Sequence, residues 1–225
     1  MPVSGGRPGV GGDVAVIGLG RFGGHVAESL SRLGHRVLAV DEDARLVRRW
    51  SHRLPYVLQA DSTDDAALRQ LGIGDFPRVV VAIGAGVEAS VLTVLALAEI
   101  GVPQIWARAT STRHARILSS VGAQHVIFPE AAMGERVAHL IISNLLDFID
   151  FGEDFAIAKT RAPDSVAGRS LAEIGLRERY GVVVVGVKSP TGPFEYAGPE
   201  TVIPRDGVLV IEGTIEQVQR FAAIG

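Results

Sequence analysis

Short apolar runs alternate with longer amphipathic stretches over the first 130 residues. The runs are rich in β-branched residues, which is typical of strands, and the stretches between them suit helices. The runs are VAVIGL, RVLAV, YVLQA, RVVVA, QIWAR and HVIF. Because apolar and polar positions hardly alternate within them, we expect parallel strands covered by helices on both faces. The pattern predicts an α/β, doubly wound parallel-sheet domain of the Rossmann type over residues 13–130.

A different order of elements follows. Apolar positions recur at helical spacing over residues 131–150, which predicts one connecting helix there. A helix over 171–178 and a final helix over 215–224 are expected among four further strands. The strands are FAIAKTRA, GVVVVGVK, TVI and GVLVIEG. This order predicts a small α+β domain over residues 151–225.

Composition narrows the class of protein. The 225-residue chain is 47% hydrophobic, carries a net charge of −3 and has no cysteine, so disulfides and thiolate chemistry are excluded. The chain is slightly acidic and its basic residues are scattered, so it forms no positively charged patch that would attract nucleic acid. We therefore expect no nucleic-acid partner. Residues 1–12, MPVSGGRPGVGG, lack the apolar segment of a secretory signal and are expected to form a flexible tail.

A glycine motif marks the junction of the first strand and the following helix. Gly18, Gly20 and Gly23 lie in VIGLGRFGGHVAESL. Gly18 allows a tight turn, Gly20 lets the backbone approach a phosphate, and Gly23 lets the helix pack against the strand, while free N–H groups at the helix start attract an anion. The motif predicts a nucleotide phosphate site, the alternative being a glycine-rich turn without a ligand.

Two charged residues extend this motif. Asp41 ends the second strand, about twenty residues on, where the fingerprint expects a ribose partner. A carboxylate there accepts hydrogen bonds from ribose hydroxyls and repels a 2′-phosphate, which disfavours NADP; a helix N-cap is the alternative role. Arg21 follows Gly20, and its guanidinium is expected to clamp a phosphate unless it is merely solvated. Phe22 beside it belongs to the same predicted site.

The ends of the next strands complete the expected crevice. Asp61 and Ser62 end the third strand, and the fourth is followed by Ala82, Ile83, Gly84 and Ala85. In an open α/β sheet, ligands bind at these carboxyl ends.

The remaining third of the chain shows no recognisable catalytic apparatus. A dehydrogenase of this fold adds a second domain with an acid or base beside the nicotinamide ring. Here the six histidines lack metal-ligand spacing, and the sequence shows no Ser–His–carboxylate set. We therefore expect a nucleotide sensor without catalytic residues rather than an enzyme. A small NAD-dependent oxidoreductase and an NADH-sensing module remain the alternatives.

Four segments together resemble the TrkA/KtrA family of potassium-transport regulators, the RCK domain proteins. They are GLGRFGGHVAESLSRLGHRVLAVDED, QADSTDDAALRQLGI, VVVAIGAGVEASVLTVLALAEIGVPQIWARA and VGAQHVIFPEAAMGERVA. The resemblance implies a cytoplasmic ring, typically a homo-octamer built from dimers, docked on a membrane potassium channel of the KtrB or TrkH type. It also implies gating in which ATP favours the conducting form and ADP the resting form.

The resemblance also assigns roles to residues. Arg21 meets the terminal phosphates and Asp41 the ribose, while Arg108 in IWARA replaces the lysine that is common there. Glu130 in FPEAAMG is expected to hold Mg²⁺ or another cation against the nucleotide. The alternative for Glu130 is a carboxylate that interacts with the N-terminal dipole of a helix.

A second ligand is implied for the C-terminal domain. Relatives bind cyclic di-AMP there between two subunits, and Arg177 in LAEIGLRERYG matches the arginine that faces its phosphate. Glu178 departs from the pattern and adds a negative charge, so an exposed helix arginine stays open as the other interpretation of Arg177.

Overall fold

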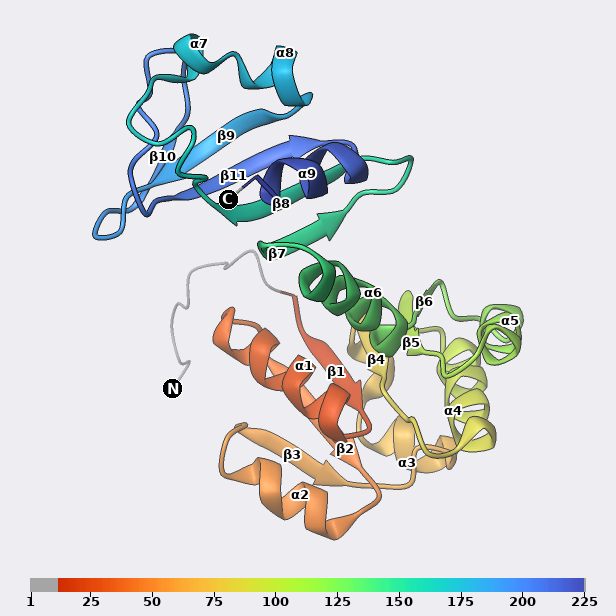
Figure 1. The fold of residues 1–225 in the computed structure, drawn as a ribbon. Helices are drawn as coiled ribbons and strands as arrows, with labels where there is room; N and C mark the ends of the chain where they lie inside the picture. Colours follow the sequence, from red (N-terminus) through yellow and green to blue (C-terminus); the bar gives the residue numbers. More distant parts are fainter. Residues whose placement is uncertain (1–11, 225) are drawn as a thin grey trace. The chain divides into compact units, whose positions relative to one another are not determined.

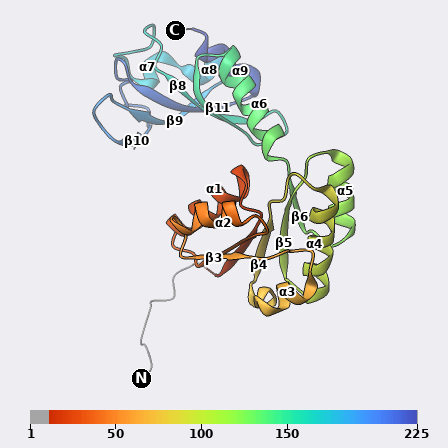
Figure 2. The same ribbon diagram turned by 90° about the horizontal axis from the view of Figure 1, so that it is seen from below.

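The computed structural model describes residues 12–224, which fall into two compact units (Figures 1 and 2). The first unit ends at Pro129 and the second begins at Glu130. The tail expected over residues 1–12 lies outside the described residues, apart from Gly12. None of the helices in residues 12–224 has the length and apolar composition that crossing a membrane requires.

The first unit contains a six-stranded sheet in which every pairing is parallel. The strand order is β3-β2-β1-β4-β5-β6, so the chain reverses its direction of travel between β1 and β4 and opens a crevice there. All six strands lie where the sequence predicts them. Their bounds are β1 Val14–Ile17, β2 Val37–Asp41, β3 Tyr56–Gln59, β4 Arg78–Val81, β5 Gln104–Arg108 and β6 His125–Ile127.

Helices cover both faces of this sheet, as the apolar runs predict. The side chains of β1 alternate between two apolar clusters: Val14 packs with Trp50 and Leu54, whereas Ile17 packs with Leu97 and residues of the opposite face. Helices α1 and α2 cover the first face, and α3, α4 and α5 cover the second. The bounds are α1 Arg21–Arg32, α2 Ala44–Ser51, α3 Asp65–Gln70, the 3₁₀ turn η1 Ile73–Asp75, α4 Val87–Ile100 and α5 Thr112–Ser120.

The second unit is an α+β domain around an antiparallel sheet of order β10-β9-β11-β8-β7. Its core is formed by fully buried side chains that include Ile203, Leu209, Ile211 and Phe221. The bounds are α6 Pro129–Ile142, β7 Leu145–Asp150, β8 Ala156–Arg161, α7 Leu171–Ile174, α8 Leu176–Tyr180, β9 Val183–Lys188, β10 Phe194–Tyr196, β11 Val208–Gly213 and α9 Ile215–Ala222. The predicted fold class is therefore confirmed for both units.

The connecting helix predicted over residues 131–150 is wrong in its second half. Helix α6 ends at Ile142, and strand β7 begins at Leu145. The error has a physical cause, because a bulge shifts the register of β7 against β8 between Leu145 and Asp147. The extra residue places the buried side chains of Leu145 and Phe148 three positions apart, which imitates helical spacing.

Two other details of the second unit differ from the sequence prediction. The helix expected over 171–178 is divided at Gly175, whose φ of 63° lies in the left-handed region and ends α7 before α8 begins. The segment TVI contributes only an isolated bridge between Ser170 and Val202, and not a strand. Instead β10, which the sequence analysis missed beside Pro193, pairs with β9 at the edge of the sheet.

Candidate nucleotide-binding site

A cavity of about 520 Å³ lies at the carboxyl ends of the parallel strands, where the strand order reverses. Its size suits a small organic ligand. Eleven of the fifteen predicted site residues line it, together with six residues that were not predicted. The predicted ones are Gly18, Gly20, Arg21, Asp41, Asp61, Ser62, Ala82, Ile83, Gly84, Ala85 and Arg108. The others are Ile17, Glu42, Asp43, Leu46, Thr63 and Ala89.

The glycine loop has the geometry that phosphate binding requires. Gly18 has a φ of 93°, and its N–H donates to the carbonyl of Val40 at 2.8 Å. At Gly23 a Cβ atom would lie 1.8 Å from the Gly18 carbonyl oxygen, so only glycine lets α1 approach the loop this closely. Helix α1 begins after Gly20 without a side-chain cap, and N–H groups of its first turn can therefore receive an anion.

Asp41 is held rigidly at the end of β2. Its Oδ2 accepts a hydrogen bond from the Leu19 N–H at 2.5 Å and its Oδ1 accepts one from the Asp43 N–H at 2.8 Å. Each oxygen keeps a further lone pair with which to accept a hydroxyl. Asp43, not Asp41, is the N-cap of α2, because its side chain accepts from the Arg45 N–H. The capping role considered for Asp41 is thus filled by its neighbour.

The end of β3 adds a second carboxylate. Asp61 accepts hydrogen bonds from the Thr63 hydroxyl at 2.7 Å and from the Thr63 N–H at 2.8 Å. Both donors stabilise the ionised form, and they hold the pKa of Asp61 below its usual range, the hydroxyl contributing most. Ser62 is buried, with its Oγ 2.8 Å from Oγ1 of Thr93 on α4. Asp61 therefore presents a fixed negative charge at neutral pH.

Charge changes sign along the crevice. The strand order up to β5 is β3-β2-β1-β4-β5. The acid Asp61 follows β3 and the acid Asp41 ends β2, whereas Arg21 follows β1 and Arg108 ends β5. A Cβ at Gly84 would lie 1.9 Å from Nη1 of Arg108, so glycine is required for the guanidinium to lie against that turn. The acidic end suits hydroxyl and amino donors, whereas the basic end suits phosphates.

Four predicted residues do not line this cavity. Gly23 and Phe22 belong to α1, where Gly23 is buried against the loop and Phe22 is half-buried. Glu130 lies at the start of α6 in the second unit, and no three His, Asp or Glu side chains come together as a metal site within residues 12–224. The cation role of Glu130 therefore remains a prediction. Arg177 lines a different cavity.

The unpredicted lining residues carried a recognisable signal. Glu42 and Asp43 directly follow Asp41, and Thr63 follows Ser62, so they extend strand ends that the sequence had already marked. Leu46 and Ala89 lie near the starts of the next helices, which begin at the same edge of the sheet. Extending each predicted strand end into the first turn of the following helix would have found these five.

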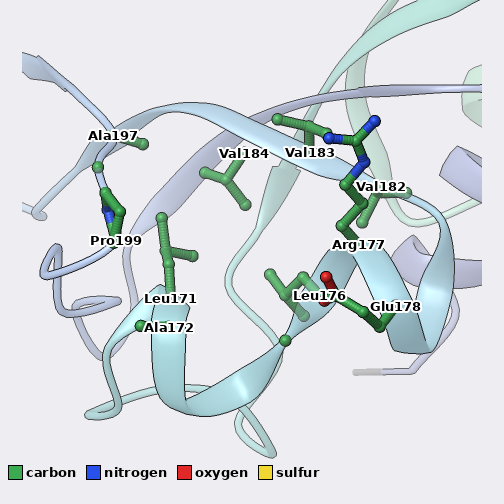
Figure 3. A pocket seen from close by; sticks show the side chains of 12 residues that line it. Leu171, Ala172, Leu176, Arg177, Glu178, Val182, Val183, Val184, Ala197 and Pro199 are labelled. Atoms are coloured by element: carbon green, nitrogen blue, oxygen red, sulfur yellow. The ribbon is translucent and has the colours of Figure 1, made fainter.

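The second unit contains its own cavity of about 380 Å³ (Figure 3). Arg177 and Glu178 on α8 are its charged lining residues. Most of the remaining lining is apolar, including Leu171, Leu176 and Val184. The left-handed Gly175 turns the chain between α7 and α8, which places both short helices beside this cavity.

The fold and the first site together define a Rossmann-type nucleotide-binding domain followed by a small α+β domain. The TrkA-N domain model matches residues 14–129, and the TrkA-C domain model matches residues 157–224. The chain therefore belongs to the TrkA/KtrA family of RCK proteins, and the resemblance seen in the sequence is confirmed.

Two proteins of Bacillus subtilis are similar to this one over almost the whole chain. The Ktr system potassium uptake protein C of Bacillus subtilis is 36% identical over 210 residues, which is 93% of this chain and 95% of that protein. The Ktr system potassium uptake protein A of Bacillus subtilis is 36% identical over 208 residues, covering 92% of this chain and 94% of that protein. Among solved structures, one titled GsuK channel bound to NAD has a TM-score of 0.64 at 19% identity and covers 97% of this chain. This chain spans 40% of that channel chain, and the likeness shows the fold.

Proposed function

We propose that this protein is the nucleotide-sensing regulatory subunit of a Ktr-type potassium uptake system. Its similarity to two Ktr proteins extends over more than nine-tenths of the chain and includes both domains. In this proposal the protein acts at the cytoplasmic face of a membrane and binds a channel subunit of the KtrB or TrkH type. It acts by changing shape when a ligand binds.

The charge gradient of the first cavity is the observation that supports a nucleotide ligand most directly. A nucleotide carries ribose hydroxyls and base amino groups at one end and phosphates at the other. Asp41 and Asp61 fit the first end, whereas the glycine loop, Arg21 and Arg108 fit the second. We infer that ATP and ADP are the ligands, and that Arg21 distinguishes them by contacting the terminal phosphates. NADH is the second candidate, because the glycine motif and Asp41 also suit a dinucleotide.

Glu130 is proposed to contribute one carboxylate to a cation that the nucleotide phosphates also bind. Mg²⁺ in nucleotide sites takes one or two protein carboxylates and draws other ligands from phosphate oxygens and water. A single glutamate fits that pattern, although a calcium-type cage of several protein oxygens would not. Whether Mg²⁺ strengthens nucleotide binding is a separate outcome of the titration.

Self-association is part of the proposal, and α6 supports it. No residue of this fourteen-residue helix is buried. Met133, Val137 and Ile141 recur every four residues, and they are 54%, 42% and 77% exposed. An apolar row of this kind on a surface helix is typical of a contact between subunits. We infer a homo-oligomeric ring, assembled from dimers and with eight subunits.

The cavity of the second unit supports a second ligand. The guanidinium of Arg177 can bind a phosphate, and the apolar surface beside it can hold a base. We infer that cyclic di-AMP binds there between the C-terminal domains of two subunits, each supplying one Arg177. Glu178 lowers the attraction for this anion and is expected to keep the affinity moderate.

Calorimetric titration of the purified protein with ATP, ADP, NADH and NADPH tests the proposal. We expect binding of ATP and ADP without turnover, weaker binding of NADH, and the weakest binding of NADPH because Asp41 repels a 2′-phosphate. Repeating the ATP titration with and without Mg²⁺ tests the cation. A clear preference for a reduced nicotinamide would overturn the assignment. Mass measurement of the native assembly with and without ATP tests the ring, and a stable monomer would contradict it.

A further inference from the structure

Trp50 packs against the glycine loop, although it does not line the nucleotide cavity. It is near the end of α2, and its side chain is 3% exposed. Its indole Nε1–H donates a buried hydrogen bond to the carbonyl oxygen of Leu19, with 2.8 Å between the two atoms. Leu19 is the residue between Gly18 and Gly20. Helix α2 is thereby tied to the centre of the phosphate-binding turn.

The geometry of a peptide bond gives this contact a directional effect. The carbonyl of Leu19 and the N–H of Gly20 belong to one planar peptide unit, and in a trans peptide they point in opposite directions. A donor that fixes the carbonyl on one side therefore fixes the direction of the Gly20 N–H on the other. A hydrogen bond to the carbonyl also polarises the peptide, which makes its N–H a better donor to an anion.

The preceding peptide is fixed in the same manner by Asp41. Its N–H, that of Leu19, donates to Oδ2 of Asp41 at 2.5 Å, and the Leu19 side chain is fully buried. The two peptide units of the turn are thus held by two residues from different elements, Asp41 at the end of β2 and Trp50 on α2. Asp41 also lines the cavity, whereas Trp50 acts only through the backbone.

The packing around Trp50 keeps the indole in place. At Gly24 on α1, a Cβ atom would lie 2.0 Å from Cζ2 of Trp50, so the ring lies directly against the backbone of that helix. His25 approaches the ring edge-on with centroids 5.8 Å apart, and the guanidinium of Arg53 lies 5.6 Å from the ring centroid. A ring confined on several sides transmits the position of α2 to the loop.

We propose that Trp50 is a positioning residue for phosphate recognition, which orients the Gly20 N–H by holding the Leu19 carbonyl. The inference rests on the proposed nucleotide site and assigns it a regulatory element, because any shift of α2 changes the phosphate-binding turn. The Trp50 hydrogen bond is made to the glycine loop, which would contact the phosphates of ATP and of ADP. Loss of this hydrogen bond should therefore weaken the binding of both nucleotides equally.

Trp50→Phe tests this role, since phenylalanine keeps an aromatic ring and removes the N–H donor. We expect the dissociation constants of ATP and ADP each to rise about five-fold, equivalent to ~1 kcal/mol, with their ratio unchanged. Trp106→Phe is the matched control. The chain has two tryptophans, and Trp106 lies on β5 away from the lining of the cavity, stacked on His125. Its replacement should leave both constants within about two-fold.

Fluorescence provides a second readout, which reports whether the Trp50 indole responds to nucleotide binding. In Trp106→Phe the sole indole is Trp50, and nucleotide binding should alter its emission because the hydrogen-bonded peptide is polarised by the phosphate. In Trp50→Phe the sole indole is Trp106, and its emission should not respond. Silent Trp50 emission in Trp106→Phe would overturn the inference, so this measurement tests it even if Trp50→Phe fails to fold.

The outcomes separate this inference from the proposed function. If the unchanged protein binds none of the nucleotides, the proposed function is overturned. If the unchanged protein binds them, the inference is overturned by unaltered affinities in Trp50→Phe, by a loss confined to ATP, or by silent Trp50 emission in Trp106→Phe. Five-fold losses for both nucleotides together with responsive Trp50 emission support it.

Discussion

The two cavities of this protein differ in how many elements form them. The first collects polar groups from the ends of β1 to β5, and hydrogen bonds hold both of its central acids in place. The second is mainly apolar and contains Arg177 and Glu178, two charges of opposite sign on one short helix. The first cavity therefore carries groups of both charge signs suited to the two ends of a nucleotide, whereas the second carries one cationic side chain. The difference supports the proposal that the second cavity acts in pairs.

Substitution of two glycines of the glycine motif, one lining the cavity and one buried beside it, should give the largest effects and separate binding from folding. A Cβ at Gly20 meets no atom within 4 Å, so Gly20→Ala should fold normally while its methyl group occupies the space of the phosphate. We expect nucleotide affinity to fall on the order of 100-fold, equal to about 2.7 kcal/mol. Calorimetric titration measures the loss, and thermal unfolding checks the fold.

Gly23→Ala is the contrasting variant. Its Cβ would meet the Gly18 carbonyl oxygen at 1.8 Å and Cβ of Ala82 at 2.7 Å, so α1 must move away from β1. We expect a loss of about 1–3 kcal/mol in the free energy of unfolding, together with lost binding. An unchanged free energy of unfolding in Gly23→Ala would contradict the close packing of α1 against the glycine loop.

Arg21→Ala should lower the affinity for ATP more than the affinities for ADP and NADH. We expect ATP affinity to fall about ten-fold or more, with smaller losses for ADP and NADH, because a charge-assisted hydrogen bond is among the stronger polar contacts. Arg48→Ala is the matched control, since Arg48 is an exposed arginine on α2 that does not line the cavity. Equal losses for ATP and NADH would contradict the role of Arg21 as a reader of terminal phosphates.

Two variants in α8 test whether the second cavity is half of a paired site. Arg177→Ala should weaken cyclic di-AMP binding about ten-fold, and Glu178→Gln should strengthen it about two- to five-fold by removing a repulsive charge. Neither should change ATP affinity. A binding stoichiometry of one cyclic di-AMP per two chains is expected from calorimetry. Binding of one cyclic di-AMP per chain would contradict the proposal that the second cavity forms only half of the site.

The smallest expected effect is a pH dependence confined to the first unit. His114 on α5 is 2% exposed, and desolvation lowers its pKa below the usual value. The unfolded chain therefore binds a proton more readily, and stability should be present above the unfolded pKa of about 6.5 and decline as the pH falls below it. From about pH 7.5 to about pH 5.5 we expect the unfolding temperature to fall by roughly 2–4 °C. The decline should be smaller in His114→Gln, and an identical decline would exclude His114 as its source.

The first unit could be predicted from sequence because its parallel strands are short, apolar and end at charged or glycine-rich turns. Asp41 and Asp61 were found because each stands at the end of such a run, whereas Arg108 was implied by the family resemblance. One edge of the sheet collects all three. Trp50 was not found. A buried tryptophan on a helix looks like a core residue, and its partner is a backbone carbonyl 31 positions away, which leaves no trace in side-chain patterns.

The second unit was harder to predict because local backbone irregularities override its periodicity. The bulge near Leu145 made a strand imitate a helix, and the left-handed Gly175 divided one predicted helix into two. Neither feature changes the composition of the segment. The fold class of this unit was therefore more predictable than the number of its elements or their boundaries.

Helix α6 has a consequence for how the protein behaves in dilute solution. If its apolar row is covered only when chains associate, then mass action links folding to the amount of protein present. The unfolding temperature should rise with protein concentration, and dilution should leave the Met133 thioether open to oxidation. With the proposed association, a rise in protein concentration would stabilise the fold as a bound ligand does.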